Sequence, residues 1–269
     1  MTTRNWRAKT LRSGCTTNTY LCKIPVVDTY VPSTLTIVSY TNTGNFTWVA
    51  PAYVTTVEYL VVGGGGGGGA AYDTGSAGGG GGGLVLTGSV SVIPGTTYTG
   101  SVGGGGAGGI AYSSASPERE VNGEDGGHSV FYSIDAPGGG GGFRSRYQTG
   151  GAGKGGDSAV GMIAPTGGNG AGNNVGGENG GGGGGNTSAG ATSFSGTLPR
   201  GGAGLASNIS GGNVIYGAGG NGGVVYTSSA GSSGGNNTGN GGSGATTVSS
   251  DIKSGGRGGS GVIILKYYV

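Results

Sequence analysis

Few residues in this chain could carry out chemistry, and they are widely spaced. There is one histidine, His128, and the only cluster of acidic residues consists of Glu118, Glu120, Glu124 and Asp125. Calcium favours oxygen ligands of this kind, but the spacing fits no EF-hand, and a solvated loop is the simpler interpretation. No serine has the sequence context of a nucleophile elbow that could work with His128. We therefore expect no metal site and no catalytic residue, and predict that the chain is not an enzyme.

Glycine-rich motifs that bind phosphate need separate attention, because the pattern GxGxxG occurs throughout the chain. Such a motif is informative only between a strand and a helix, and no such context is present. Lys154 is followed by Gly155 rather than by Ser or Thr, so it does not belong to a P-loop. We expect no nucleotide and no cofactor.

The segments between the glycine runs are better functional candidates, because loops on rigid scaffolds commonly carry recognition. They combine polar groups with aromatic and arginine side chains, the usual anchors of binding surfaces. The alternative is that each aromatic ring only packs on glycine backbone. The segment from Phe143 to Tyr147 is our first choice. The full set of candidates is Tyr72, Asp73, Tyr112, Phe143, Arg144, Arg146, Tyr147, Phe194, Arg200 and Tyr226.

Residues 1–33 form a distinct head that is basic and carries no acidic residue before Asp28. We interpret it as a docking segment that binds a partner subunit; the alternative is a solvated basic terminus. Five basic residues with no further basic face make a weak footprint for nucleic acid, so no nucleic-acid partner is expected. The residues expected to dock are Arg4, Trp6, Arg7, Lys9 and Arg12.

The head also contains the only two cysteines, Cys15 and Cys22. A disulfide across the six intervening residues could close a small hairpin at Thr17–Asn18. Two unpaired thiols, as in a protein folded in a reducing cytoplasm, are the alternative. Two cysteines and the distant His128 do not make a complete zinc site.

The start of the chain lacks the apolar region of a secretion signal, and no run approaches the roughly 20 apolar residues that span a bilayer. We expect synthesis in a cytoplasm, no export by the common route and no insertion into a membrane.

Short segments rich in β-branched and aromatic residues, bounded by turn formers, predict strands. Ile93-Pro94-Gly95-Thr96 has the residues that a type II turn prefers. No segment shows a convincing helical period, and glycine interrupts every candidate helix, so we expect almost no α-helix. The predicted strands are 35–40, 45–49, 55–62, 84–86, 88–93, 96–99, 128–134 and 262–268.

Glycine dominates the composition, with 75 of 269 residues, whereas about 7% is usual. Collagen is excluded, because there are only 8 prolines and no strict G-X-Y period. Extended left-handed helices of three residues per turn, built from glycine, are the alternative that we favour. With no side chains, such helices can approach closely and pair all their N–H and C=O groups. Only glycine or an occasional alanine should then occupy the middle of a tract, and other residues should gather at its ends.

The predicted fold class is therefore all-β, a short-stranded β-sheet or sandwich combined with a bundle of polyglycine II helices. Residues 1–33 form the attachment segment, and residues 34–269 form the glycine-rich domain. The C-terminal strand, 261–268, is expected to close onto the early strands.

Residues 44–269 resemble the glycine-rich domains of phage tail proteins. The resemblance lies in Phe46-Thr-Trp-Val-Ala-Pro51, in the strand Thr56–Val62 that runs into Gly63–Gly69, and in the segment 84–106. The ending 255–267 is similar to that domain's closing strand. Related tracts occur in the tip adhesins of T-even-like phage long tail fibres, where glycine helices form a sandwich and loops at its far end contact a host receptor. The first 33 residues and the interspersed strands depart from those adhesins.

The resemblance implies a non-enzymatic virion structural protein, a tail-fibre or tail-tip adhesin located in the virion. Expected partners are other tail or fibre subunits, through residues 1–33, and a host surface polysaccharide or outer-membrane protein. A homo-oligomer is also compatible with the sequence. The alternative is a structural decoration or filament protein with no receptor of its own, which would be present in many more copies than an adhesin.

Overall fold

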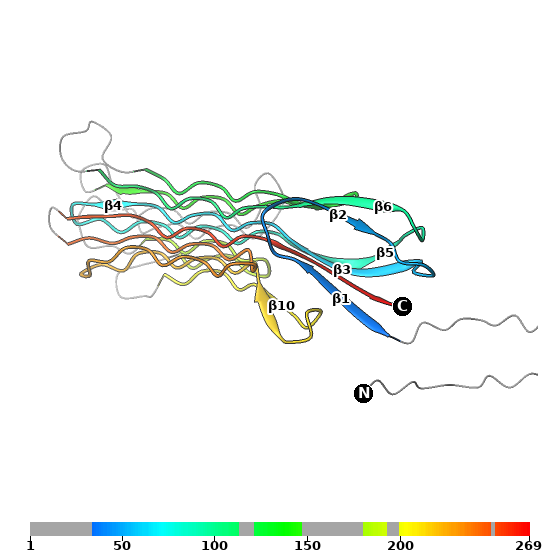
Figure 1. The fold of residues 1–269 in the computed structure, drawn as a ribbon. Helices are drawn as coiled ribbons and strands as arrows, with labels where there is room; N and C mark the ends of the chain where they lie inside the picture. The colour runs from blue at the N-terminus through cyan, green and yellow to red at the C-terminus, as the bar shows by residue number, and fades with distance from the viewer. Residues whose placement is uncertain (1–33, 113–120, 147–179, 193–198, 249–250) are drawn as a thin grey trace, which may run out of the picture.

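The computed structural model describes residues 34–112, 121–146, 180–192, 199–248 and 251–269. Two sheets form one end of the molecule, and extended glycine tracts run from them to the opposite end (Figure 1). The described residues contain strands and no helix, in agreement with the predicted all-β class. Residues 1–33, with the predicted docking residues and both cysteines, lie outside the described residues.

The sheets are antiparallel and pack face to face as a sandwich. The first contains β1 (Leu35–Tyr40), β13 (Val262–Tyr268), β3 (Thr56–Val62) and β5 (Val85–Ser91), in that order. The second contains β2 (Gly44–Val49), β6 (Thr97–Val102), β7 (Ser129–Phe131) and β8 (Ile134–Ala136). The C-terminal strand β13 pairs with both β1 and β3.

The core of the sandwich lies between these sheets. Trp48 and Phe131 come from the second sheet and meet Val57 and Leu265 from the first. Phe131 and Leu265 are fully buried, and burial of each side chain of this size contributes about 1.5–3 kcal/mol. On the outer face of the first sheet, Leu60 and its neighbours are covered by the hairpin of β10 (Leu205–Ser207) and β11 (Val214–Tyr216).

Two of the predicted strand boundaries are wrong. The segments 84–86 and 88–93 form one strand, β5, because Gly88 continues the ladder opposite Tyr59. The segment 128–134 is instead split between β7 and β8 by a turn at Tyr132, which has φ 55°. The turn at 93–96 is confirmed: Gly95 has φ +76°, and the N–H of Thr96 donates to the carbonyl of Ile93.

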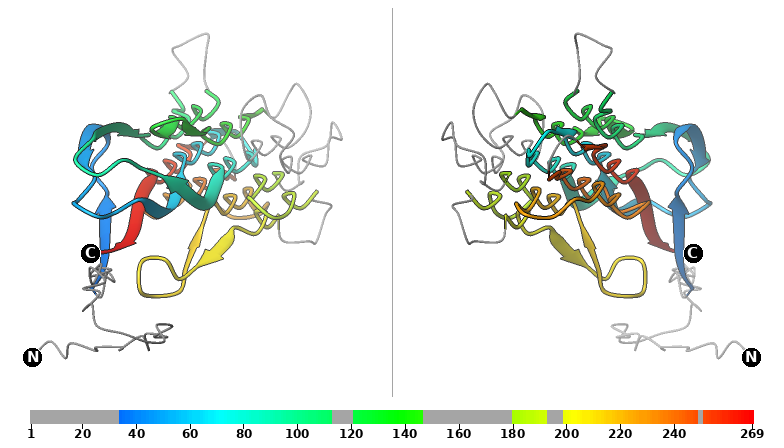
Figure 2. Two further views of the ribbon diagram at one scale, coloured as in Figure 1. Left: turned by 90° about the vertical axis from the view of Figure 1, so that its right-hand side faces the viewer. Right: turned by 90° about the vertical axis from the view of Figure 1, so that its left-hand side faces the viewer.

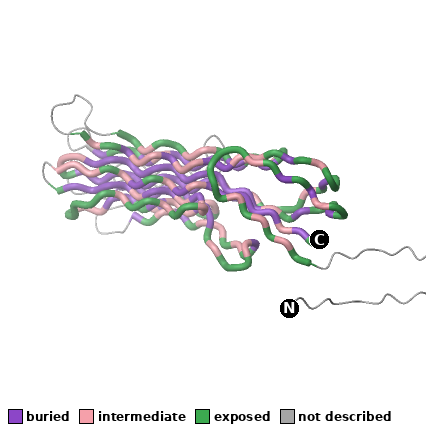
Figure 3. The backbone as a smooth tube through the Cα atoms, in the orientation of Figure 1, coloured by how far each residue is buried: buried purple, intermediate pink, exposed green. Residues whose placement is uncertain are grey.

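The glycine tracts lie side by side and run back and forth along the long axis (Figure 1). Viewed end on, they form a bundle of narrow coils (Figure 2). We call this bundle the glycine array. The tract Gly63–Gly69 follows β3 directly and is buried throughout, and the buried tracts occupy the middle of the array (Figure 3). The tracts of the array lie within 63–69, 78–83, 103–109, 121–127, 138–144, 180–192, 199–204, 217–224, 230–245 and 254–261.

Hydrogen bonds around the tract 63–69 repeat every three residues. Every third N–H donates to the same neighbour, so the tract is bonded through its donors to 78–84, 121–127 and 254–261. Its carbonyl oxygens accept, with the same repeat, from 103–109, 138–142 and 239–245. Six neighbours therefore surround it, and its buried polar backbone groups are paired. A left-handed three-residue helix requires this repeat; the assignment of the tracts as polyglycine II helices stays a prediction.

Glycine is required in the interior because the neighbouring backbones leave no room for a side chain. A Cβ on Gly66 would lie 2.1 Å from the carbonyl oxygen of Gly140, and a Cβ on Gly80 would lie 2.2 Å from that of Gly66. At the surface of the array the restriction ends. A Cβ on Gly104 would have only the side chain of Thr43 as a neighbour, at 4.0 Å.

The prediction that side chains avoid the middle of the tracts is wrong at the edges of the array. In the tract 121–127, Gly123 and Gly126 face Gly67 and Gly64, while Asn122 and Asp125 are exposed. Their side-chain oxygens accept hydrogen bonds from the N–H groups of Arg144 and Gly141, at 2.9 and 2.8 Å. An edge tract lacks a neighbour on one side, so its side chains supply the acceptors that a further backbone would provide.

Candidate functional site

Chain reversals gather at the end of the array opposite the sandwich, which we call the distal end. Three two-residue strands form a small sheet there: β12 (Ile252–Lys253), β4 (Ala71–Tyr72) and β9 (Ser145–Arg146). Thr246 makes isolated bridges with Ser76 and Ser229, which join two more turns to this sheet. The distal end therefore brings together segments that lie far apart in the sequence.

Among the predicted candidates, Tyr72 lies in the middle strand of the distal sheet, β4. It pairs in register with Arg146 of β9 on one side and with Ile252 of β12 on the other. Asp73 follows in a turn with φ 47°, and its N–H donates to the carbonyl of Asp251. The backbones of Tyr72 and Arg146 thus lie side by side, with Asp73 in the turn that follows.

The remaining distal candidates are exposed. Phe143 and Tyr112 are 46% and 47% exposed, and Tyr226 is 82% exposed in a turn with φ 62°. The N–H of Arg144, another exposed residue, is held by Asn122. Arg200 is exposed at the start of a different tract, where its carbonyl accepts from Ala191 rather than from β4 or β9.

Two predicted candidates, Tyr147 and Phe194, lie outside the described residues, as do Glu118 and Glu120 of the acidic cluster. The other members of that cluster belong to the edge tract described above, and Asp125 bonds to backbone there. Within the described ranges, no three residues of the types that bind metals lie close enough to hold an ion. His128 bonds to Asp135 at 2.9 Å, and both side chains are exposed near β7 and β8.

Sequence reasoning missed Asp251, which fixes the distal turns. Its Oδ2 accepts from Ser228 Oγ at 2.5 Å and lies 3.0 Å from Lys253 Nζ, and its Oδ1 accepts from the N–H of Ile252. The hydrogen bond from Ser228, followed by those from Lys253 and Ile252, lowers the pKa of Asp251 from 3.8 to about 2. The sequence signal was an acidic residue two positions before a basic one, Lys253, in a spacer without aromatic residues.

Buried hydroxyl groups were also missed. Ser76, Ser145, Thr246 and Thr247 are each at most 3% exposed. Ser145 Oγ accepts from the N–H of Ser76, and Thr247 Oγ1 accepts from that of Gly75. These contacts replace backbone partners where the tracts turn, so the distal segments are tied to one another rather than to solvent alone.

A family model for a glycine-rich domain matches residues 41–268 of the chain. No curated protein matches it. The described residues contain no helix that could span a membrane.

Proposed function

Given that the chain belongs to the glycine-rich domain family, we propose that it is a non-enzymatic virion structural protein. In this proposal it acts as a phage tail-fibre or tail-tip adhesin, which attaches by its sandwich end and presents receptor-binding residues at its distal end. Its location is the virion, and it carries no cofactor.

The observation that supports this proposal is that the two ends of the molecule differ. Thr34 and Val269 exchange two backbone hydrogen bonds at the sandwich end. The segment 1–33 is therefore joined to the domain at this end. The distal end carries the exposed side chains of Tyr112, Phe143 and Tyr226. The head, residues 1–33, would therefore dock into a tail or fibre subunit while the distal residues face a host surface polysaccharide or outer-membrane protein.

The array suits this role because it separates the two ends without a flexible linker. A tract of seven residues spans about 20 Å at about 3.1 Å per residue, and each one is bonded to several neighbours. Exposed aromatic rings held on such a support lose little conformational freedom on binding, which favours affinity.

Binding of labelled full-length protein to a panel of bacterial strains tests the proposal. Tyr226 and Tyr53 form a matched pair: both are exposed, at 82% and 68%, and both have positive φ, but they lie at opposite ends. We expect Tyr226→Ala, combined with Phe143→Ala, to lower binding at least about tenfold, since anchor residues each contribute about 2 kcal/mol or more. Tyr53→Ala should bind like the wild type.

Equal binding by the distal and sandwich-end variants, or no binding to any strain, would reject the adhesin role and favour the purely structural alternative. Removal of residues 1–33 tests attachment separately. The truncated chain should fail to enter particles, and normal incorporation would show that the head does not dock.

A further inference from the structure

β1 is an edge strand, and its backbone groups on one side have no partner among the described residues. In the first sheet it pairs only with β13. Residues of an antiparallel pair alternate between those that exchange hydrogen bonds and those that do not. Since Thr34 and Val269 exchange two such bonds, every second residue from Thr34 bonds to β13. The N–H and C=O groups that point to the open side are those of Leu35, Ile37 and Ser39.

The exposed face of β1 is apolar. Val38 and Tyr40 pack against the core, so Leu35 and Ile37 project from the other face of the sheet, where they are 47% and 37% exposed. Tyr268 of β13 lies opposite Leu35 and is 51% exposed. Edge strands are usually protected by a charged residue, a proline or a bulge, and β1 has neither charge nor proline. An apolar strand with free donors and acceptors is suited to pair with another strand.

The opposite edge of the same sheet, β5, is polar. The N–H of Val92 donates to the carbonyl of Thr55, and the alternation that starts there leaves every second residue of β5 on its open side. These residues are Thr87, Ser89 and Ser91, and all three are exposed. Hydroxyl side chains keep this edge in contact with water, so β5 lacks the apolar surface that β1 offers.

The edges of the second sheet are also less suited to pairing. β2 carries two polar side chains, Asn45 and Thr47, and one apolar side chain, Val49, on its exposed face. β8 has only three residues, and the central one is the exposed Asp135. Among the described edge strands of the sandwich, β1 therefore combines length, apolar side chains and the absence of charge.

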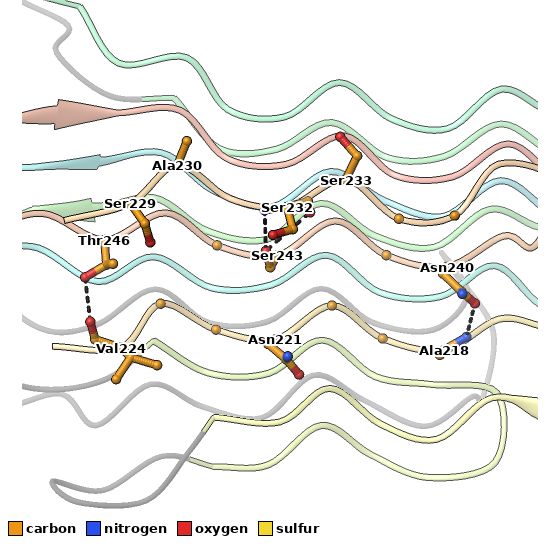
Figure 4. Close-up of a pocket in the computed structure, with 18 of the residues that line it drawn as sticks. Ala218, Asn221, Val224, Ser229, Ala230, Ser232, Ser233, Asn240, Ser243 and Thr246 are labelled. Carbon is orange, nitrogen blue, oxygen red and sulfur yellow. Dashed lines mark hydrogen bonds between the residues drawn. The ribbon is translucent and has the colours of Figure 1, made fainter. Parts of the chain in front are cut away.

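The groove on the side of the array is a surface of another kind (Figure 4). Its lining residues carry no charge, and two of its polar side chains bond to the array itself. Asn240 Oδ1 accepts from the N–H of Ala218 at 2.9 Å, and Thr246 Oγ1 donates to the carbonyl of Val224 at 2.8 Å. These groups already have partners within the chain, whereas the open groups of β1 have none among the described residues.

One register between two copies of β1 pairs every open group. With the strands antiparallel and Ile37 opposite Ile37 of the second copy, Leu35 of each copy lies opposite Ser39 of the other. All the open N–H and C=O groups are then bonded, in the pattern of an antiparallel ladder. A shift by two residues leaves Leu35 or Ser39 unpaired, and a shift by one sets open groups against groups that already bond to β13.

We propose that β1 pairs in this register with β1 of a second copy of this chain. The two first sheets then continue as one, and the exposed side chains of Leu35 and Ile37 pack beside those of the second copy. Because both copies use the same surface, the contact is isologous and closes at the dimer. The inference does not depend on the adhesin role.

Sedimentation equilibrium of the full-length protein over a range of concentrations tests this proposal. The wild type should form dimers as its concentration rises, and no larger species. Ile37→Pro should weaken dimerisation at least about tenfold, because the two hydrogen bonds donated by the N–H groups at this position are lost. The protomer should keep its stability in urea, since an edge strand accepts proline where the N–H faces outwards. Ser89→Pro makes the same change on the open side of β5 and should dimerise like the wild type.

Two charged variants test the register without altering the backbone. Ile37→Lys and Ile37→Glu should each dimerise about fivefold more weakly or worse, because like charges would lie directly opposite each other. An equal mixture of the two should associate more tightly than either variant alone, since a lysine then faces a glutamate. A wild type that stays monomeric at every concentration, as expected if β1 instead receives a strand of another protein, would overturn the proposal. So would species larger than the dimer, an Ile37→Pro protein that dimerises like the wild type, or a mixture no tighter than its components.

Discussion

At the scale of single residues, Gly66 and Gly104 show how much depends on where a Cβ would point. Both stand in glycine tracts and neither has positive φ, so backbone preference does not separate them. We expect Gly66→Ala to lower the free energy of unfolding by about 3 kcal/mol or more, because the new methyl group would overlap the Gly140 carbonyl. Gly104→Ala should change it by less than about 1 kcal/mol, and could raise it by restricting the unfolded chain.

Urea unfolding of both variants measures the difference. A Gly66→Ala protein as stable as Gly104→Ala would show that neighbouring tracts are not in close contact at Gly66.

Asp251 gives the distal turns a dependence on pH. Its pKa in the folded protein is lowered to about 2, so its contribution to stability is present above the unfolded value of about 3.9 and is lost as the pH falls towards 2. We expect the amide resonances of Asp73 and Ile252 to shift and broaden between pH 4 and pH 2, because both depend on Asp251. Asp251→Asn should remove this transition, and Asp135→Asn should leave it unchanged.

At the scale of elements, side chains at every third position of the edge tract 121–127 accept hydrogen bonds from backbone N–H groups of the neighbouring tract. We call this pairing edge closure. Removing the acceptor in Asp125→Ala should lower the free energy of unfolding by about 1 kcal/mol, since the N–H of Gly141 would lose its partner. Asp125→Asn keeps an acceptor oxygen and should cost less. Glu124→Ala, in the same exposed tract but without a side-chain bond in the described residues, should be neutral; a cost equal to that of Asp125→Ala would count against edge closure.

The strands of the sandwich could be predicted from the sequence, but the three-residue repeat of polar side chains along the edge tracts was missed. Leu35–Tyr40 and Val262–Tyr268 are recognisable because β-branched and aromatic residues fill them. The hairpin of β10 and β11 is too short for this signal, and its burial comes from the distant Leu60. The repeat was visible in Ser254-Gly-Gly-Arg257-Gly-Gly-Ser260, yet it has meaning only when one side of a tract is known to face solvent.

The candidate site could be predicted in part. Aromatic spacers pointed to Tyr72, which lies in β4, and to Tyr226, which lies in a turn. Tyr72 and Ile252 pair although they lie 180 positions apart in the sequence, and no local pattern encodes this pairing. Asp251 was missed for the same reason, since its partner Ser228 lies 23 residues away in the sequence.

At the scale of the whole molecule, the sandwich and the array are continuous. β3 runs into Gly63, β6 into Gly103, and Gly261 into β13. We expect them to unfold together. Phe131→Ala should cost about 3–5 kcal/mol and should lower the hydrogen-exchange protection of the Gly66 amide as much as that of the Leu60 amide. Protection retained at Gly66 alone would show two independent units.

The three-residue repeat also limits how tracts of this kind can change in length. In a strand, insertion of one residue exchanges the two faces. In the tract 121–127, it would turn the remainder by one third of a revolution, directing Asn122 or Glu124 towards the backbone that Gly123 now meets. Insertions and deletions of three residues restore the original phase and only shift where the reversal occurs. Viable length variants should therefore differ in steps of three, so the array can be lengthened in units of one turn.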